Sequence, residues 1–426
     1  MKSNTCTFLA FVKTPLAVAL CLASASALAS PQAFMSSRSF AMGGTGVAIA
    51  HPAAAGASNP SMMASKHHDW SDDFGLILPS VNARFADEEE TVDQIDGIQD
   101  LIDEFEEAQQ SFNQQGAQDT AGELRRRLNA FDRDTVRVDA GLGIALAVPT
   151  DSYSVGFFTN GNLQATVRGE FDKDDEETLR KIENGTTPIA GVNLDQELES
   201  RGKVLASAVT EVGIAVATFI DLADGSRLQV GVSPKYVQLR TFQYTETVAG
   251  FEDDNFDNDE NETDKSGLNL DVGAAYAFGE QNEWNAGVVV KNLIPMELDS
   301  NPSPDPRKNE QEYTLELKPM LTAGIAHTGN FHVVTAELDL TKKKGFGYAD
   351  DTQWLAVGVE LDAWRYAQIR FGARQNLASN DDNNGIAEET QFTAGIGLSL
   401  FGARLDLGAL VSDADMGAAL ELGAAF

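Results

Sequence analysis

The sequence predicts an all-β fold: a transmembrane antiparallel β-barrel of about 14 strands, with an N-terminal plug and helical insertions in its outer loops. Three observations predict this class. An apolar leader opens the chain, segments that alternate apolar and polar residues recur from residue 73 onward, and the connections between them are alternately short and long. Successive side chains of a strand point to opposite faces, so each segment would present one apolar face. A closed barrel lets strands satisfy every backbone hydrogen bond inside a membrane.

Residues 1–29 are expected to be a secretory signal peptide. Lysines precede an apolar stretch over residues 16–28, and an A-x-A pattern predicts cleavage after Ala29. The apolar run is too short for a retained anchor. Cys21 offers a lipoprotein interpretation as an alternative, although a leucine precedes it where a small residue is wanted. Beyond the signal we expect a hatch or plug over residues 30–72 and a barrel over 73–426, located in a bacterial outer membrane.

Composition excludes several other classes. Both cysteines, Cys6 and Cys21, lie in the leader, so the mature chain is expected to lack disulfides, a thiol nucleophile and cysteine metal ligands. The net charge of −34 argues against nucleic acid as a partner, because phosphate backbones require clustered cations. After residue 29 no apolar run approaches the roughly 18 residues of a membrane helix. We expect no cofactor and no dedicated metal site.

The alternating segments are expected to form strands. They lie near residues 73–85, 135–148, 153–170, 203–218, 226–248, 266–278, 284–292, 313–326, 331–341, 352–361, 366–375, 389–400, 402–411 and 415–426. Tight turns fall at 149–152, 221–225, 279–283, 327–330, 362–365 and 401–402, and long connections at 86–134, 171–202, 249–265, 293–312, 342–351 and 376–388. Short periplasmic turns and long outside loops are typical of outer-membrane barrels.

The same alternation assigns a set of charged side chains to the barrel lumen. Both signs are present, so structural ion pairing is one interpretation and selectivity or gating is the other. The assigned residues are Arg137, Asp139, Glu211, Lys235, Asp271, Lys291, Glu316, Lys318, Glu337, Asp339, Glu360, Arg370, Arg404, Asp406 and Glu421.

Aromatic residues near strand ends predict interfacial girdles, with ordinary strand packing as the alternative. They are Trp284, Trp354, Trp364, Tyr276, Tyr366 and Phe426.

The first long connection, 86–134, carries apolar residues at helical spacing and predicts two amphipathic helices, broken near Gly116, that cap the barrel. Their apolar stripe would pack on the chain itself or on a partner. A further helix is expected to open the connection 171–202. The acidic run within 249–265 suggests either Ca²⁺ binding or a solvated loop facing lipopolysaccharide, but an EF-hand glycine is missing from its frame.

Residues 30–72 do not alternate and supply the hatch. They contain Met42-Gly43-Gly44-Thr45-Gly46-Val47-Ala48 and then Asn59-Pro60. Nothing like Gly-Lys-Ser/Thr follows the glycines, which excludes a phosphate loop. This segment resembles the start of the FadL-type transport barrels, and the resemblance implies a hatch inside a 14-stranded barrel that moves hydrophobic compounds. The expected hatch or gate residues are Arg38, Gly43, Gly44, Gly46, His51, Asn59 and Pro60.

The whole chain, especially residues 32–64 and 350–426, resembles the barrel-like conjugal-transfer TraF family more closely. No Cys-x-x-Cys is present, so no redox role is expected. Ser61 replaces the alanine of the family-type Asn-Pro-Ala, and the acidic helical insertion is an addition.

Two functions remain open at this point. One is passage or binding of a hydrophobic or amphipathic small molecule through a gated barrel, and the other is a non-transporting scaffold or adhesion barrel that serves conjugation or envelope assembly. An enzyme is not expected, because the five histidines, His51, His67, His68, His327 and His332, lie far from any outer-rim serine cluster. Expected partners are outer-membrane lipid, lipopolysaccharide and the barrel-assembly machinery.

The last strand ends on an aromatic residue, Phe426, which resembles the C-terminal signal of outer-membrane barrels. We therefore predict that deleting Phe426 impairs membrane assembly and leaves export intact, because the assembly machinery would no longer recognise the strand. The readout is the heat-modifiable folded form on semi-native electrophoresis. Normal insertion of the truncated protein would count against this assignment.

Overall fold

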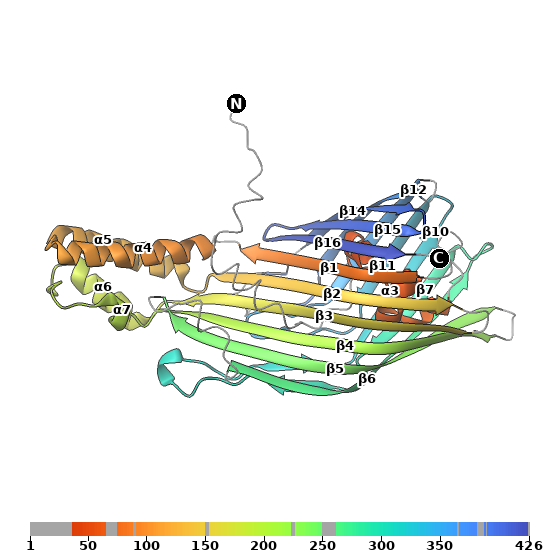
Figure 1. Cartoon of the computed structure of the whole chain (residues 1–426), viewed down its shortest axis with the longest axis horizontal. Helices are drawn as coiled ribbons and strands as arrows, with labels where there is room; N and C mark the ends of the chain where they lie inside the picture. The colour runs from red at the N-terminus through yellow and green to blue at the C-terminus, as the bar shows by residue number, and fades with distance from the viewer. Residues whose placement is uncertain are drawn as a thin grey trace, which may run out of the picture.

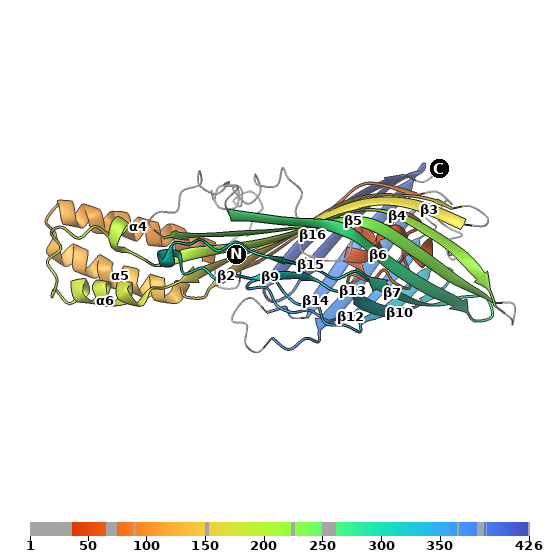
Figure 2. The same ribbon diagram turned by 90° about the horizontal axis from the view of Figure 1, so that it is seen from below.

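The computed structural model describes residues 36–64, 75–87, 91–149, 153–222, 226–248, 261–363, 366–380, 387–388 and 390–424. Fourteen antiparallel strands close into one barrel, and residues 36–64 lie inside it (Figures 1 and 2). The order around the wall is β1-β16-β15-β14-β13-β12-β11-β10-β7-β6-β5-β4-β3-β2, and β1 pairs with both β2 and β16 to complete the ring. The predicted fold class is confirmed.

The barrel strands agree closely with the alternating segments. They are β1 (Gly75–Asp87), β2 (Thr135–Pro149), β3 (Tyr153–Glu170), β4 (Arg201–Asp221), β5 (Arg227–Thr247), β6 (Glu262–Phe278), β7 (Trp284–Lys291), β10 (Met320–Thr328), β11 (His332–Asp339), β12 (Trp354–Ala363), β13 (Ala367–Asn376), β14 (Gln391–Leu400), β15 (Ala403–Val411) and β16 (Asp415–Ala424).

The two faces of the strands differ as the alternation requires. On β16, Leu420 and Leu422 are exposed on the outside, whereas Ala419 and Glu421 are buried. On β13, Ile369 and Phe371 are likewise exposed and apolar. An apolar outer surface with buried polar groups inside is the arrangement that a barrel adopts in lipid.

One predicted strand is wrong. The segment 313–326 breaks into β9 (Thr314–Leu317) and β10, and β9 pairs with β8 (Met296–Asp299) in a separate two-stranded sheet. Glu316 and Lys318 therefore belong to this hairpin and not to the lumen face of a barrel strand. They pair with each other, with Lys318 exposed and Glu316 half-buried. The physical reason is that the apolar side of this hairpin packs elsewhere, against inward residues of β4 and β5.

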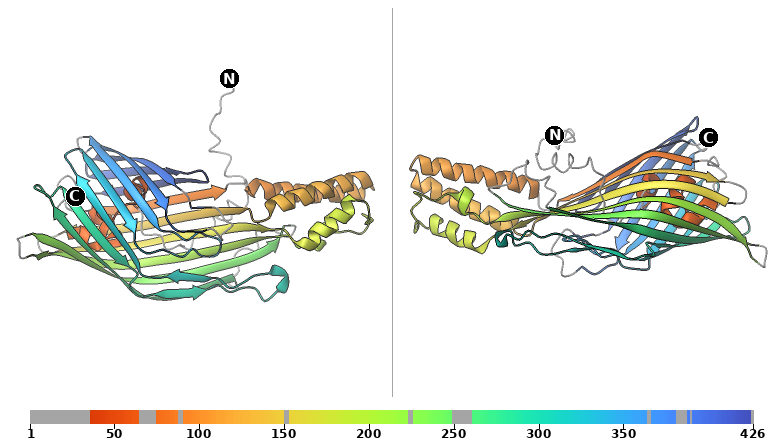
Figure 3. Two further views of the ribbon diagram at one scale, coloured as in Figure 1. Left: turned by 180° about the vertical axis from the view of Figure 1, so that it is seen from behind. Right: turned by 60° about the horizontal axis from the view of Figure 1, so that its bottom comes forward.

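Helices extend from the outer mouth of the barrel as an arm (Figure 3). They are α4 (Thr91–Gln110), α5 (Gln114–Phe131), α6 (Lys173–Glu183) and α7 (Leu194–Glu197). Their apolar stripes bury one another, so the stripe packs on the chain itself. The expected cap across the barrel is wrong, because this arm carries its own core and extends away from the mouth. Among the described residues, no helix combines the length and apolarity needed to cross a membrane.

The hatch comprises α2 (Ser37–Ala41), α3 (Pro52–Ser58) and the 3₁₀ turn η3 (Pro60–Ala64). The Ser36 side chain caps α2, and the His51 ring accepts a hydrogen bond from Ala53 at the start of α3. Most residues between 37 and 64 are buried, including a run of alanines in α3. Small side chains let the hatch fill the lumen without displacing the wall.

Glycines of the wall make room for the hatch backbone. A Cβ at Gly372 would lie 2.2 Å from the Gly43 nitrogen, and one at Gly287 would lie 2.4 Å from the Val47 oxygen. Similar contacts place Gly273 against Asn59 and Gly231 against Pro60. Any larger residue at these positions would overlap the hatch.

We predict that Gly372→Ala loosens the hatch, because the added methyl would overlap backbone atoms at a cost of about 1–3 kcal/mol. The readout is a lower temperature for loss of the folded band on semi-native electrophoresis. Gly267→Ala is the matched control, because its Cβ would meet only the flexible end of Met296, at 3.3 Å. Equal stability of the two variants would contradict the close approach.

Candidate functional site

The centre of the hatch–wall interface is a carboxylate held by backbone amides. Glu337 on β11 accepts hydrogen bonds from the amides of Gly46 (3.0 and 2.9 Å), Val47 (2.7 Å) and Ala48 (3.1 Å). Successive amides that converge in this way form an anion-binding nest. Glu337 is buried, so the same contacts satisfy both the carboxylate and three buried amides. The glycine-rich turn of the hatch therefore binds a carboxylate of the barrel wall, that of Glu337.

A second contact is an ion pair with the neighbouring strand, β12. Arg38 of α2 binds Glu360 of β12 through both ends of its guanidinium, at 2.9 and 2.8 Å. Glu360 also accepts from Arg370 at 2.6 Å, and Arg370 contacts Asp406 at 2.5 Å. Asp406 then pairs with Arg404, so the hatch arginine continues a charge chain that runs along the wall. Bidentate arginine–carboxylate pairs are among the stronger hydrogen-bonded contacts in proteins.

Further wall side chains hold the hatch through its backbone. Lys291 donates to the Ala57 oxygen at 2.6 Å, Asn285 to Ala48 at 2.7 Å and Ser233 to Gly56 at 2.8 Å. Glu421 accepts from the Ser37 amide at 2.9 Å, and Thr393 accepts from the Gly43 amide at 2.9 Å. These contacts reach the hatch from four different strands, β5, β7, β14 and β16.

The remaining predicted hatch residues have structural positions in the turn and in η3. Gly43 and Gly44 have φ angles of +75° and +88°, which favour glycine. Asn59 donates to the Val47 oxygen at 2.7 Å and accepts from Ser61, so it ties η3 to the turn. Pro60 contacts the wall at Gly231.

Most of the other lumen charges form two ion-pair groups within the barrel. Lys235 bridges Glu211 at 2.7 Å and Asp271 at 2.9 Å between neighbouring strands. Toward the outer side, Arg84 and Arg137 share Asp415 at 2.9 and 2.8 Å, with Asp139 and Glu388 beside them. Although burial favours the neutral form, Arg137 and Arg84 hold the pKa of Glu388 at about 2. All lumen residues assigned to barrel strands are buried except Asp339 and Arg404, which are half-buried.

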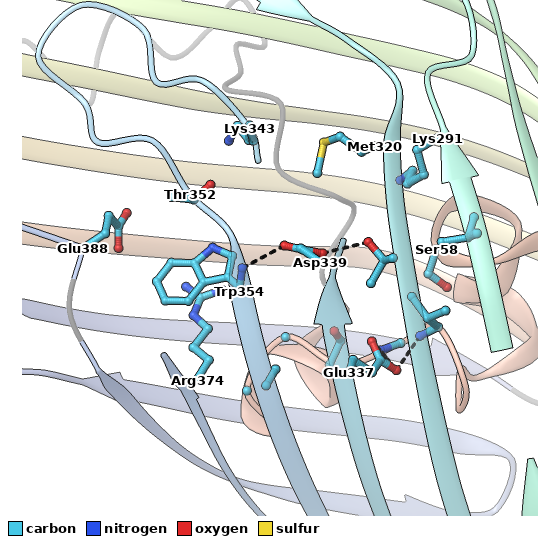
Figure 4. Close-up of a pocket in the computed structure, with 18 of the residues that line it drawn as sticks. Ser58, Lys291, Met320, Glu337, Asp339, Lys343, Thr352, Trp354, Arg374 and Glu388 are labelled. Atoms are coloured by element: carbon cyan, nitrogen blue, oxygen red, sulfur yellow. Dashed lines mark hydrogen bonds between the residues drawn. The ribbon is translucent and has the colours of Figure 1, made fainter. Parts of the chain in front are cut away.

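A cavity of about 130 Å³ lies between the hatch turn and the outer ion cluster (Figure 4). Its apolar wall includes Val289, Met320 and Ala356, and its polar wall includes Glu337 and Arg374. The Arg374 guanidinium lies 4.2 Å from the centre of the Trp354 ring, a cation–π contact inside the lumen.

Trp354 therefore does not belong to an interfacial girdle, and that prediction is wrong for this residue. It shares the inward face of β12 with Ala356 and Glu360. Trp284 and Tyr366 are exposed, and the Trp284 ring centre lies 4.7 Å from that of His327, at the end of the barrel that carries the short turns.

Several predicted features lie outside the described residues. They are Ala29 and the signal, Trp364, Phe426, His67 and His68, and most of the acidic run within 249–265. In the part of the chain that is described, no group of three or more histidines, cysteines or carboxylates is placed to hold a metal ion.

Residues that sequence reasoning missed are the wall glycines, Asn285, Ser233 and Thr393. The alternation already placed Gly273 and Gly395 on the inward face, but only the docked hatch shows why glycine is required there. Small inward-facing residues at the same height on several strands are the signal that could have indicated a segment packed against the wall.

A family model described as "F plasmid transfer operon, TraF, protein" matches residues 56–339. The chain belongs to this family. The match runs from α3 of the hatch to the end of β11, so it includes Asn59, Pro60 and Glu337. Among curated protein sequences no match is found.

Several solved structures share the fold of this TraF-family chain. A TodX monoaromatic hydrocarbon channel variant has a TM-score of 0.53 at 12% identity, over 93% of this chain and 98% of that one. The CymD monoaromatic hydrocarbon channel has a TM-score of 0.52 at 10% identity, over 93% and 99%. A Pseudomonas aeruginosa FadL homologue has a TM-score of 0.50 at 9% identity, over 94% and 99%. At such identities the likeness shows the fold alone.

We predict that Glu337→Ala releases the hatch turn while the barrel stays closed. Three buried amides would lose their acceptor, at about 1–3 kcal/mol each. The readout is protease cleavage within residues 36–64 of the purified protein in detergent. Glu297→Ala removes an exposed carboxylate of β8 and is the control. Hatch cleavage at the wild-type rate in Glu337→Ala would show that the nest does not hold the segment.

Proposed function

We propose that this TraF-family chain is an outer-membrane channel for small hydrophobic or amphipathic compounds, with residues 36–64 as its gate. The observation that carries the proposal is the hatch itself, a separate segment that fills the lumen and is held by side chains of many strands. A barrel that served only as an anchor would not need a lumen segment docked through backbone contacts. The closed barrel and the channels of similar fold support an outer-membrane location.

Apolar surface lies along the route from outside to the hatch. Inward residues of β4 and β5, among them Leu205 and Leu239, pack against the β8–β9 hairpin and Phe346. Below this cluster is the cavity over the hatch turn, with Val289 and Met320 in its wall. An apolar solute would exchange contacts with these groups on its way to the cavity.

The arm formed by α4–α7 favours a second candidate function, a scaffold that contacts another envelope component. The arm has its own apolar core and an exposed acidic face, so it is a folded element separate from the lumen. In this case the lumen would stay closed. Both candidates are non-enzymatic, in keeping with the channels of similar fold.

We predict that a Gram-negative host expressing the protein takes up the hydrophobic dye N-phenylnaphthylamine faster than the empty host. Ala356→Trp should abolish the difference, because Ala356 lines the cavity. Leu355→Trp is the matched control, since Leu355 is the neighbouring residue on β12 and is exposed on the outer face. Folding of both variants is checked by heat-modifiability.

Dye entry that equals that of the empty host would contradict the channel and favour the scaffold. Equal entry through wild type and Ala356→Trp would also exclude a route through this cavity.

A further inference from the structure

A second, larger cavity of about 520 Å³ lies at the outer end of the wall, away from the hatch. Arg168 and Glu170 at the end of β3, Lys203 at the start of β4 and Thr245 near the end of β5 contribute to it. Transmembrane strands need about 9–11 residues, whereas β4 and β5 have 21 each, so their outer ends extend beyond the bilayer. The cavity therefore lies outside the membrane.

The wall of this cavity places cations opposite one another. Arg168 and Lys203 are direct cross-strand partners on the same inward face. Like charges in this arrangement destabilise a sheet. Arg133, just before β2, lies close enough to repel Arg168 as well, and Lys173 at the start of α6 adds a fourth cation. These four cations gather at one site although the net charge of the chain is −34.

Carboxylates only partly balance these cations. Glu170 pairs with Lys203, and Asp132 lies 3.9 Å from Arg133. Glu310 accepts from the Ser303 amide, inside its own loop, at 2.5 Å. The lining thus contains four cations against three carboxylates, and an anion entering the cavity would relieve repulsion between its walls.

The rest of the lining suits a hydroxylated ligand. Tyr348 lies under the Arg168 guanidinium at 4.6 Å, and its ring centre is 5.9 Å from that of Tyr313. Amides of Gln243, Asn309 and Gln311 complete the lining. Pockets for apolar ligands are mainly apolar and have volumes of roughly 300–1,000 Å³. This cavity has such a size with a polar, cationic and aromatic wall.

We propose that this outer cavity binds an anionic saccharide, one that carries carboxylate or phosphate groups. Arg168, Lys203 and Lys173 contact the acidic groups, the tyrosine rings contact the sugar faces, and the amides bond to hydroxyls. The ligand comes either from a soluble saccharide or from the phosphorylated sugars of lipopolysaccharide. The site does not involve the hatch, so it does not depend on passage through the lumen.

Isothermal calorimetry on the purified full-length protein tests the site with digalacturonate as the probe and lactose as its neutral counterpart. We expect digalacturonate to bind, its affinity to fall as salt is added, and lactose to give no heat. Arg168→Gln with Lys203→Gln should weaken binding roughly 10- to 100-fold, because charge-assisted bonds are lost. Lys173→Gln should weaken it several-fold, and Lys173 is exposed, so this variant keeps the test valid if the double variant misfolds.

Arg227→Gln is the matched control, since Arg227 is an exposed cation that pairs with Asp221 at the other end of the barrel.

The source of the ligand is distinguished in nanodiscs with and without lipopolysaccharide. Loss of digalacturonate binding when lipopolysaccharide is present supports the lipid source, and unchanged binding supports the soluble saccharide. The proposal would be overturned if digalacturonate gave no heat in any preparation or if lactose bound equally well. It would also be overturned if both the Arg168→Gln/Lys203→Gln variant and Lys173→Gln bound digalacturonate with wild-type affinity.

Discussion

Close approach between the hatch backbone and the barrel wall is the constraint on which the rest of the structure depends. Backbone amides and carbonyls inside a lumen need partners, because an unpaired buried polar group costs about 1–3 kcal/mol. The hatch has little regular structure of its own, with helices of five and seven residues. Several of its backbone groups therefore bond to the wall. The hatch backbone can approach the wall closely where glycines such as Gly372 and Gly287 leave room.

The interface between the hatch and the wall both closes the lumen and sets how the hatch can be released. Glu337 and Glu360 each hold the hatch through charge-assisted bonds, whereas the alanine-rich faces of α3 contribute contacts that are small and individually weak. A segment held mainly at a few polar points can detach as a unit when those points are lost. The outer ion cluster around Asp415 and the Lys235 triad join neighbouring wall strands to one another, so they would stay in place.

Period-two alternation predicted the strands well because one face of each must be apolar and the other small or polar. The same alternation also places Trp354 inside the barrel, because Trp354 and Glu360 are an even number of residues apart on β12. The β8–β9 hairpin escaped prediction because its four-residue strands alternate like barrel strands, and only tertiary packing on Leu205 and Val237 distinguishes them. The Glu337 nest joins residues 290 positions apart, a pairing that no local pattern encodes.

Amide hydrogen exchange at Gly46, Val47 and Ala48 tests the central claim most directly, since these three amides define the docked state. In the folded protein we expect them to exchange as slowly as amides in the middle of β12, because all three bond to a buried carboxylate. Exchange on the timescale of solvent-exposed loops would mean that the hatch is not docked on Glu337, and the gate proposed here would then be wrong.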